Sequence, residues 1–172
     1  ASLVNPDRLY YVVVGDLTFF YDLNSLGNHH IGTNLRVMLV NNGRGTEFRL
    51  GIHHCNVFGD DADKYMAAAG HFGNKSPLLV KHYAEDLGFH YLSATTKEEF
   101  MTALSNFTNP QLSDHSMILE VFTDSKDESE ALYLMSHIQS DAKGMVRSKL
   151  KDAVRNVAGE KGINAIKKIL KK

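Results

Sequence analysis

The sequence predicts an α/β fold with a mostly parallel sheet, arranged as three layers of helix, sheet and helix. Two apolar runs, residues 9–14, which are unbroken, and residues 35–40, which are interrupted only by Arg36, are typical of strands that are buried on both faces, as in parallel sheets. The first run ends at Gly15-Asp16 and the second at Asn41-Asn42-Gly43. Residues 17–26 between them have helical apolar spacing, so the three segments form a strand–helix–strand unit.

The rest of the chain continues the alternation of helix and strand. Residues 44–77 are irregular, and we expect one short helix around residues 64–69 within a surface excursion. The other expected elements are a helix at 78–87 ending at Gly88, a strand at 89–92, a helix from the capping box Thr96/Glu99 to about 107, a strand at 117–122 and an amphipathic helix at 128–138.

Charge divides the chain into an acidic body, expected to be one domain (1–142), and a basic helical tail (143–172). The tail holds ten Lys/Arg and two acidic residues, whereas the body holds nine Lys/Arg and eighteen acidic residues. An acidic body argues against nucleic-acid binding. The tail could lie on an anionic membrane, but docking within the assembly is the favoured interpretation. The single cysteine, and the lack of a signal sequence or a long apolar run, predict a cytoplasmic protein.

Two polar residues follow the first two predicted strands. Asp16 and Asn42 stand 26 residues apart. Because ligands of open α/β sheets bind at the carboxyl ends of the strands, neighbouring strands would bring both side chains to one ion. A carboxylate, an amide oxygen and a backbone carbonyl from the turn at residues 43–45 suit Mg²⁺, which completes its shell with phosphate oxygens and water. Each feature alone is common, and their joint occurrence predicts a metal site.

A phosphate group would be held by the residues that follow Asp16. Leu17 and Thr18 begin the first predicted helix, where unpaired N–H groups and the helix dipole favour an anion. The Thr18 hydroxyl could add a further donor. The ligand that fits this arrangement is a diphosphate bridged by magnesium.

Gly15-Asp16 followed by Asn41-Asn42 resembles the motif shared by thiamine-diphosphate-dependent enzymes. The stretches GDLTFFYDLNSL (15–26) and VMLVNNGRG (37–45) are most similar to the SEPHCHC synthase family of menaquinone biosynthesis, which also has Leu after the motif aspartate. LLVKHYAEDLGF (78–89) and MILEVFTD (117–124) are similar to the closing helix and strand of the same domain. The resemblance covers about residues 4–124, and it is to the C-terminal, diphosphate-binding domain.

The resemblance implies thiamine diphosphate and Mg²⁺ as cofactors. Asp16 and Asn42 would bind the metal through side chains and Arg44 through its carbonyl, while Gly15, Leu17 and Thr18 would contact the diphosphate. The implied activity is that of a 2-oxo acid decarboxylase or synthase, a lyase or transferase acting on a small 2-oxo acid within a homo-oligomer.

Glu47 departs from the family pattern, because relatives often have an apolar residue there, near the thiazolium. It could be a catalytic proton-transfer or substrate-contact group, or an exposed loop carboxylate. Phe48 could line the cofactor pocket or pack in the core. This mismatch keeps an acetolactate-synthase-like enzyme or another thiamine-diphosphate decarboxylase open.

The resemblance also implies a partner domain. The family's catalytic glutamate lies on an N-terminal pyrimidine-binding domain, and nothing in this sequence resembles it. The first strand and helix of the diphosphate-binding domain are also expected to be missing, with Ala1–Asn5 as the tail of that helix. We therefore expect a fragment, inactive alone, or a subunit completed by another chain. A non-catalytic flavodoxin-like binding module is the alternative from another class.

Other candidate sites receive structural interpretations. The pairs His29-His30 and His53-His54 lack the spacing of zinc ligands. Cys55 has neither a paired cysteine nor a catalytic signature. The cluster Asp60, Asp61 and Asp63 lacks the remainder of a calcium-loop pattern, and a solvated acidic loop is favoured.

Overall fold

The computed structural model describes residues 1–50, 53–61, 76–111, 114–137 and 149. The chain divides into two compact units, Ala1–Glu128 and Ser129–Lys172. The expected short helix at 64–69 and nearly all of the basic tail lie outside the described residues. The predicted domain boundary after residue 142 therefore stays a prediction.

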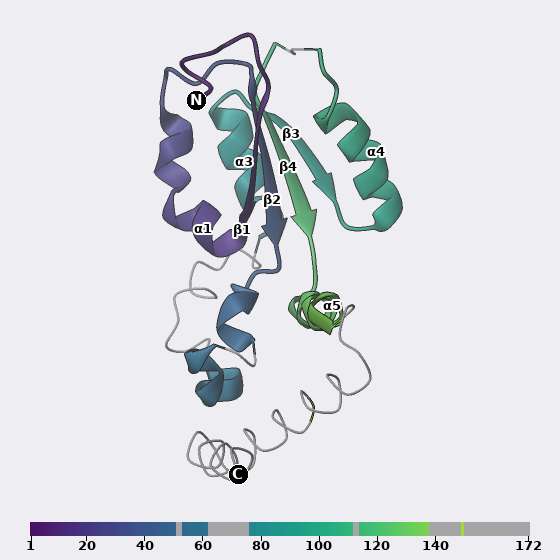
Figure 1. Ribbon diagram of the computed structural model, residues 1–172. Coiled ribbons are helices and arrows are strands. Elements are labelled where there is room, and N and C mark those ends of the chain that lie inside the picture. Colours follow the sequence, from purple (N-terminus) through teal and green to yellow (C-terminus); the bar gives the residue numbers. More distant parts are fainter. Residues whose placement is uncertain (51–52, 62–75, 112–113, 138–148, 150–172) are drawn as a thin grey trace, which may run out of the picture. The chain divides into compact units, whose positions relative to one another are not determined.

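A four-stranded parallel sheet forms the centre of the first unit. Its strands are β1 (Tyr10–Gly15), β2 (Leu35–Asn41), β3 (His90–Ala94) and β4 (Met117–Phe122), in the order β1-β2-β4-β3. All pairings are parallel, and the arrows in Figure 1 accordingly point the same way. The predicted α/β fold with a parallel sheet is confirmed.

Helices cover both faces of the sheet. One face packs against α1 (Asp16–Tyr21) and α3 (Leu79–Asp86), and the other packs against α4 (Lys97–Phe107). The first core cluster comprises Phe19, Val37, Leu39, Val80, Ala84, Phe89 and Ile118. The second comprises Ala103, Phe107, Met117 and Leu119. The helices α3 and α4 flank the sheet in Figure 1, which confirms the three-layer arrangement.

The first strand differs from its prediction. Within the described part of the chain, β1 pairs with β2 alone, and Tyr11, Val12 and Val13 are 47%, 40% and 65% exposed. The expectation of burial on both faces is wrong for this strand, because it lies at the sheet edge and α4 packs over β3 and β4 instead.

The first helix is also shorter than predicted. It ends at Tyr21, and Leu23–Gly27 forms a 3₁₀ turn, η1, after a break at Asp22. The 3₁₀ turn keeps Leu23 and Leu26 packed on the core, so the apolar spacing is satisfied without a continuous helix.

The chain start forms a single hydrogen-bonded turn, and the expectation that residues 1–5 are the tail of a family helix stays a prediction. The N–H groups of Val4 and Asn5 both donate to the carbonyl of Ala1, at 3.0 and 3.2 Å. The buried Asn34 side chain donates to the carbonyls of Ser2, Asn5 and Arg8, at 3.0, 3.3 and 3.0 Å. Pro6 disfavours helical geometry at the residue before it, so this turn ends by Asn5.

The later helices agree closely with the sequence. Gly88, at φ +81°, follows α3, and the Thr96/Glu99 capping box begins α4. The helix α5 (Ser125–His137) starts three residues earlier than predicted, since Asp124 Oδ1 accepts from the N–H groups of Lys126 and Asp127 at 2.8 and 3.2 Å.

Two 3₁₀ segments, η2 (Thr46–Arg49) and η3 (His54–Asp61), follow β2.

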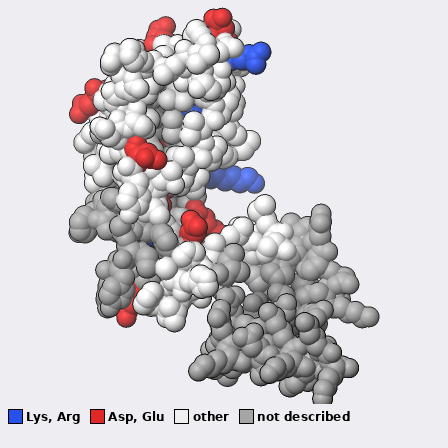
Figure 2. Space-filling view, turned by 60° about the vertical axis from the view of Figure 1, so that its left-hand side comes forward, with Lys and Arg blue, Asp and Glu red and all other residues white. Residues whose placement is uncertain are grey.

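In the described ranges, no helix is long and apolar enough to cross a membrane. Charged side chains on the face drawn in Figure 2 are scattered among neutral ones.

Candidate functional site

The candidate site lies at the carboxyl edge of the sheet, where β1 and β2 end side by side. Gly15 pairs with Val40 in the parallel register, so Asp16 and Asn42 leave the sheet at the same edge. The prediction that these two strands are neighbours in the sheet is confirmed.

Asp16 is a buried carboxylate that is 2% exposed. Its Oδ1 accepts from the N–H of Leu17 at 2.7 Å, and its Oδ2 accepts from those of Arg44 and Gly45 at 2.9 and 3.5 Å. Among the residues with described placement, all of its hydrogen-bond donors are backbone amides. Backbone N–H donors stabilise the ionised carboxylate but carry no net positive charge, so a bound cation would supply the countercharge at this position.

The side-chain oxygen of Asn42 accepts from the same backbone N–H group as Asp16 does. Its Oδ1 accepts from the Arg44 N–H at 2.9 Å, the same distance that separates this nitrogen from Asp16 Oδ2. Two oxygens of the types that Mg²⁺ prefers therefore meet around one backbone position.

The turn that carries Arg44 depends on two glycines. Gly43 and Gly45 have φ of +71° and +59°, which other residues adopt only with strain. The side chain of Asn41 supports this turn, because its Oδ1 accepts from the Gly43 N–H at 3.0 Å. The predicted role of the Arg44 carbonyl stays a prediction, since the contacts found here involve its N–H.

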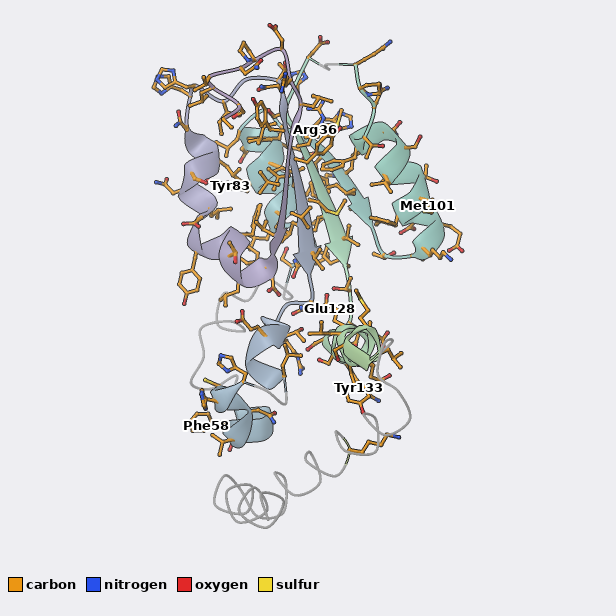
Figure 3. The ribbon with its side chains drawn as sticks, viewed as in Figure 1. Arg36, Phe58, Tyr83, Met101, Glu128 and Tyr133 are labelled. Carbon is orange, nitrogen blue, oxygen red and sulfur yellow. The ribbon has the colours of Figure 1, made fainter. Side chains whose placement is uncertain are left out.

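Two glutamates that the sequence did not single out hold the two asparagines. Asn41 Nδ2 donates to Glu120 Oε1 at 2.7 Å, and Asn42 Nδ2 donates to Glu128 Oε2 at 2.7 Å. Figure 3 places Glu128 at the start of α5, near the ends of β2 and β4. Glu120 had a sequence signal, because it is the one charge in the apolar strand 117–122. Glu128 had none.

Burial shifts the ionisation of the Glu120 network. Glu120 is 1% exposed, and desolvation raises its pKa although Tyr91 and Asn41 donate hydrogen bonds to it. The Tyr91 hydroxyl donates to Glu120 Oε2 at 2.6 Å, and burial, followed by this bond, raises the pKa of Tyr91.

The remaining residues that were predicted to contact the cofactor differ in exposure and in what they contact. Gly15 is exposed, and a Cβ built on it would meet no atom within 4 Å, so open space adjoins the start of α1. The Leu17 N–H is bonded to Asp16, while Thr18 lines a cavity of about 230 Å³ between β1, α1 and η1. Glu47 is exposed in η2, and the side chain of Phe48 lies outside the described part.

The histidine, cysteine and aspartate clusters do not form a second candidate metal site within the described residues. In the ranges that the structure describes, no group of three or more His, Cys, Asp or Glu residues could hold a metal ion. Cys55 is half-buried, and its N–H donates to His53 Nδ1 at 3.1 Å. Asp61 is exposed in η3, whereas Asp63 lies outside the described residues.

Comparisons with known proteins give a consistent family. No family model matches the chain. Proteins named 2-succinyl-5-enolpyruvyl-6-hydroxy-3-cyclohexene-1-carboxylate synthase are similar to it: those of Bacteroides fragilis (34% identical over 125 residues) and Phocaeicola vulgatus (34% over 128), each matched over 73% of this chain and 21% of the relative. The protein of that name from Cytophaga hutchinsonii is 32% identical over 127 residues, 74% of this chain and 21% of the relative.

The chain spans about a fifth of the length of the curated relatives it matches. The similarity still extends over nearly three quarters of the chain and recurs in several organisms under one name. The chain is therefore a relative of one region of the 2-succinyl-5-enolpyruvyl-6-hydroxy-3-cyclohexene-1-carboxylate synthases, as its motifs predict.

Proposed function

We propose that this chain supplies the diphosphate- and magnesium-binding side of a thiamine-diphosphate-dependent synthase with the activity that its relatives' name describes. The observation that carries the proposal is the convergence of Asp16 Oδ2 and Asn42 Oδ1 on one backbone nitrogen, each at 2.9 Å. The identity of the cofactor is inferred from the resemblance of the Asp16 and Asn42 motif to that of thiamine-diphosphate-dependent enzymes.

Each residue would have a distinct task. Asp16 and Asn42 would hold Mg²⁺ through their side-chain oxygens, and the turn at Arg44 would add its carbonyl. The open space beside Gly15 leaves room for the diphosphate, next to Leu17 and Thr18. Anchoring the diphosphate fixes the position of the reactive ring relative to a substrate, which is an entropic contribution to catalysis. When bound, thiamine diphosphate serves as the electron sink for decarboxylating a 2-oxo acid.

The rest of the active site would come from a pyrimidine-binding domain in the same or another chain, within a homo-oligomer. Glu47 is the residue of this chain that we propose for substrate contact or proton transfer. Its exposed position near the end of β2 is compatible with that role.

The proposal is tested by Asp16→Asn in the intact protein. The change removes the buried charge but keeps the size of the side chain. We expect Mg²⁺-dependent binding of thiamine diphosphate, measured by calorimetry, to fall below detection.

Asp7→Asn is the matched control, because Asp7 is an exposed aspartate in the turn before β1, away from the carboxyl edge of the sheet. It should bind the cofactor as the unchanged protein does. Equal cofactor affinity in Asp16→Asn and the unchanged protein, with and without magnesium, would show that the site is misassigned.

A further inference from the structure

We propose that Glu128 is a positioning residue that fixes the orientation of the Asn42 amide, so that the amide oxygen faces the metal position. This inference rests on the proposed function. It adds a residue 86 positions away in the sequence, on a different element, to the determinants of metal affinity.

The hydrogen bonds of Asn42 define which end of its amide faces the site. Nδ2 donates to Glu128 Oε2 at 2.7 Å, while Oδ1 accepts from the Arg44 N–H at 2.9 Å. A flipped amide would place its oxygen against the carboxylate and its NH₂ group against an N–H donor. Both contacts would be repulsive, so the carboxylate permits one orientation.

Glu128 is itself held in place by the start of α5. The Thr123 hydroxyl donates to Glu128 Oε1, and the Glu128 N–H donates to the Asp124 carbonyl at 3.0 Å. The Thr123 N–H in turn donates to the Asn41 carbonyl at 3.0 Å, which ties this turn to the end of β2. The half-buried carboxylate is thus fixed relative to Asn42 rather than free to rotate.

The bond from Asn42 to Glu128 removes the alternative orientation, in which an NH₂ group would face the cation. Partners of this kind, which orient a ligand without touching the metal, typically change metal affinity about 10- to 100-fold when removed.

The test compares Glu128→Ala with Glu128→Gln in the intact protein, using Mn²⁺ as a paramagnetic probe of the magnesium site. Glutamine can still accept the Asn42 N–H through its own oxygen, whereas alanine cannot. We expect Mn²⁺ affinity, measured by EPR titration in the presence of thiamine diphosphate, to fall about 10- to 100-fold in Glu128→Ala. Glu128→Gln should recover most of that loss.

Water proton relaxation gives a second signature that is independent of activity. If the amide no longer presents its oxygen, a water molecule replaces it on the bound Mn²⁺, and relaxation enhancement rises in Glu128→Ala. Asp127→Asn removes a neighbouring exposed charge from the same helical turn, and it should leave both measurements unchanged.

The outcomes separate this inference from the proposed function. Tight Mn²⁺ binding in Glu128→Ala, together with its loss in Asp16→Asn, would overturn the positioning role alone. An equal loss in Glu128→Gln and Glu128→Ala would overturn it as well, because the charge rather than the hydrogen bond would then matter. Absence of Mn²⁺ binding in the unchanged protein would overturn the proposed function and this inference together.

Discussion

Tyr91, Glu120 and Asn41 form a hydrogen-bonded row across β3, β4 and β2, directly before the turn that carries Arg44. The row begins at the Tyr91 hydroxyl, passes through both oxygens of Glu120, and ends where Asn41 Oδ1 accepts from the Gly43 N–H. It connects the interior of the sheet to the candidate metal site. Removing one member leaves a buried polar atom without its partner.

Tyr91→Phe tests the strength of this row. The change deletes the donor to a buried carboxylate, and we expect a loss of about 1.5–3 kcal/mol in the free energy of unfolding, the range for bonds to charged groups. Denaturant unfolding measures this loss.

Tyr83→Phe is the matched comparison, since the Tyr83 hydroxyl donates to the neutral Leu23 carbonyl at 3.0 Å. Its cost should be smaller, about 0.5–1.5 kcal/mol. Equal costs for the two variants would contradict the view that the Glu120 bond is charge-assisted.

Asp16 and Asn42 could be predicted from sequence because each follows a strand end, and strand ends are marked by apolar runs. Glu128 could not, because it reaches Asn42 only once α5 begins at Ser125 rather than at residue 128. The capping contacts of Asp124 set that start, and the apolar spacing of residues 128–138 does not reveal them.

At the scale of elements, α4 is the helix whose start is most fully specified by local sequence. Thr96 accepts from the Glu99 N–H at 3.2 Å, and Glu99 accepts in return from the Thr96 N–H at 3.2 Å. Two otherwise unpaired donors are satisfied, so the helix begins at a defined residue.

Thr96→Ala should therefore destabilise the protein by about 1 kcal/mol, the usual cost of losing such a cap. Thr102→Ala, on the exposed surface of the same helix, should be neutral or slightly stabilising, because alanine is the better helix former. Chemical denaturation of both variants checks the difference, and a Thr96→Ala curve that coincides with that of Thr102→Ala would refute it.

The two elements at the N-terminal side show why boundaries are harder to predict. The apolar run 9–14 predicts a strand but not which strands lie beside it, so the exposure of Val13 depends on the sheet order. The spacing of Phe20, Leu23 and Leu26 predicts a face, and both an α-helix and a 3₁₀ turn place these residues on the core.

Glu120 makes the stability of the whole molecule depend on pH, in the direction of lower stability at higher pH. Its folded pKa lies above the ordinary value of 4.5 because burial disfavours the charge. As pH rises through 4.5, the unfolded chain loses this proton first, so stability falls until the folded pKa is passed.

Glu120→Gln removes this contribution while keeping the size of the side chain. The unchanged protein should lose stability relative to Glu120→Gln as pH rises from about 4 to 8, as measured by denaturant unfolding at each pH. A stability difference that is constant over this range would contradict the raised pKa.

The alternation of strands and helices along the chain predicts an α/β protein, and the sheet and its two helical layers confirm this. The alternation does not determine the sheet order β1-β2-β4-β3, since four parallel strands allow several orders. The charge contrast between the body and residues 143–172 is visible in the sequence alone. Its proposed consequence, docking of the tail within an assembly, stays a prediction.

Within the described residues, the hydrogen bonds to the Asp16 carboxylate all come from main-chain N–H groups. Main-chain donors do not change when side chains are exchanged, provided that the glycines keep the turn. The exposed side chains of Arg44 and Glu47 could thus be replaced while the contacts that hold Asp16, the proposed metal ligand, persist. The main-chain contacts to Asp16 can therefore be conserved during evolution while the surrounding exposed side chains change.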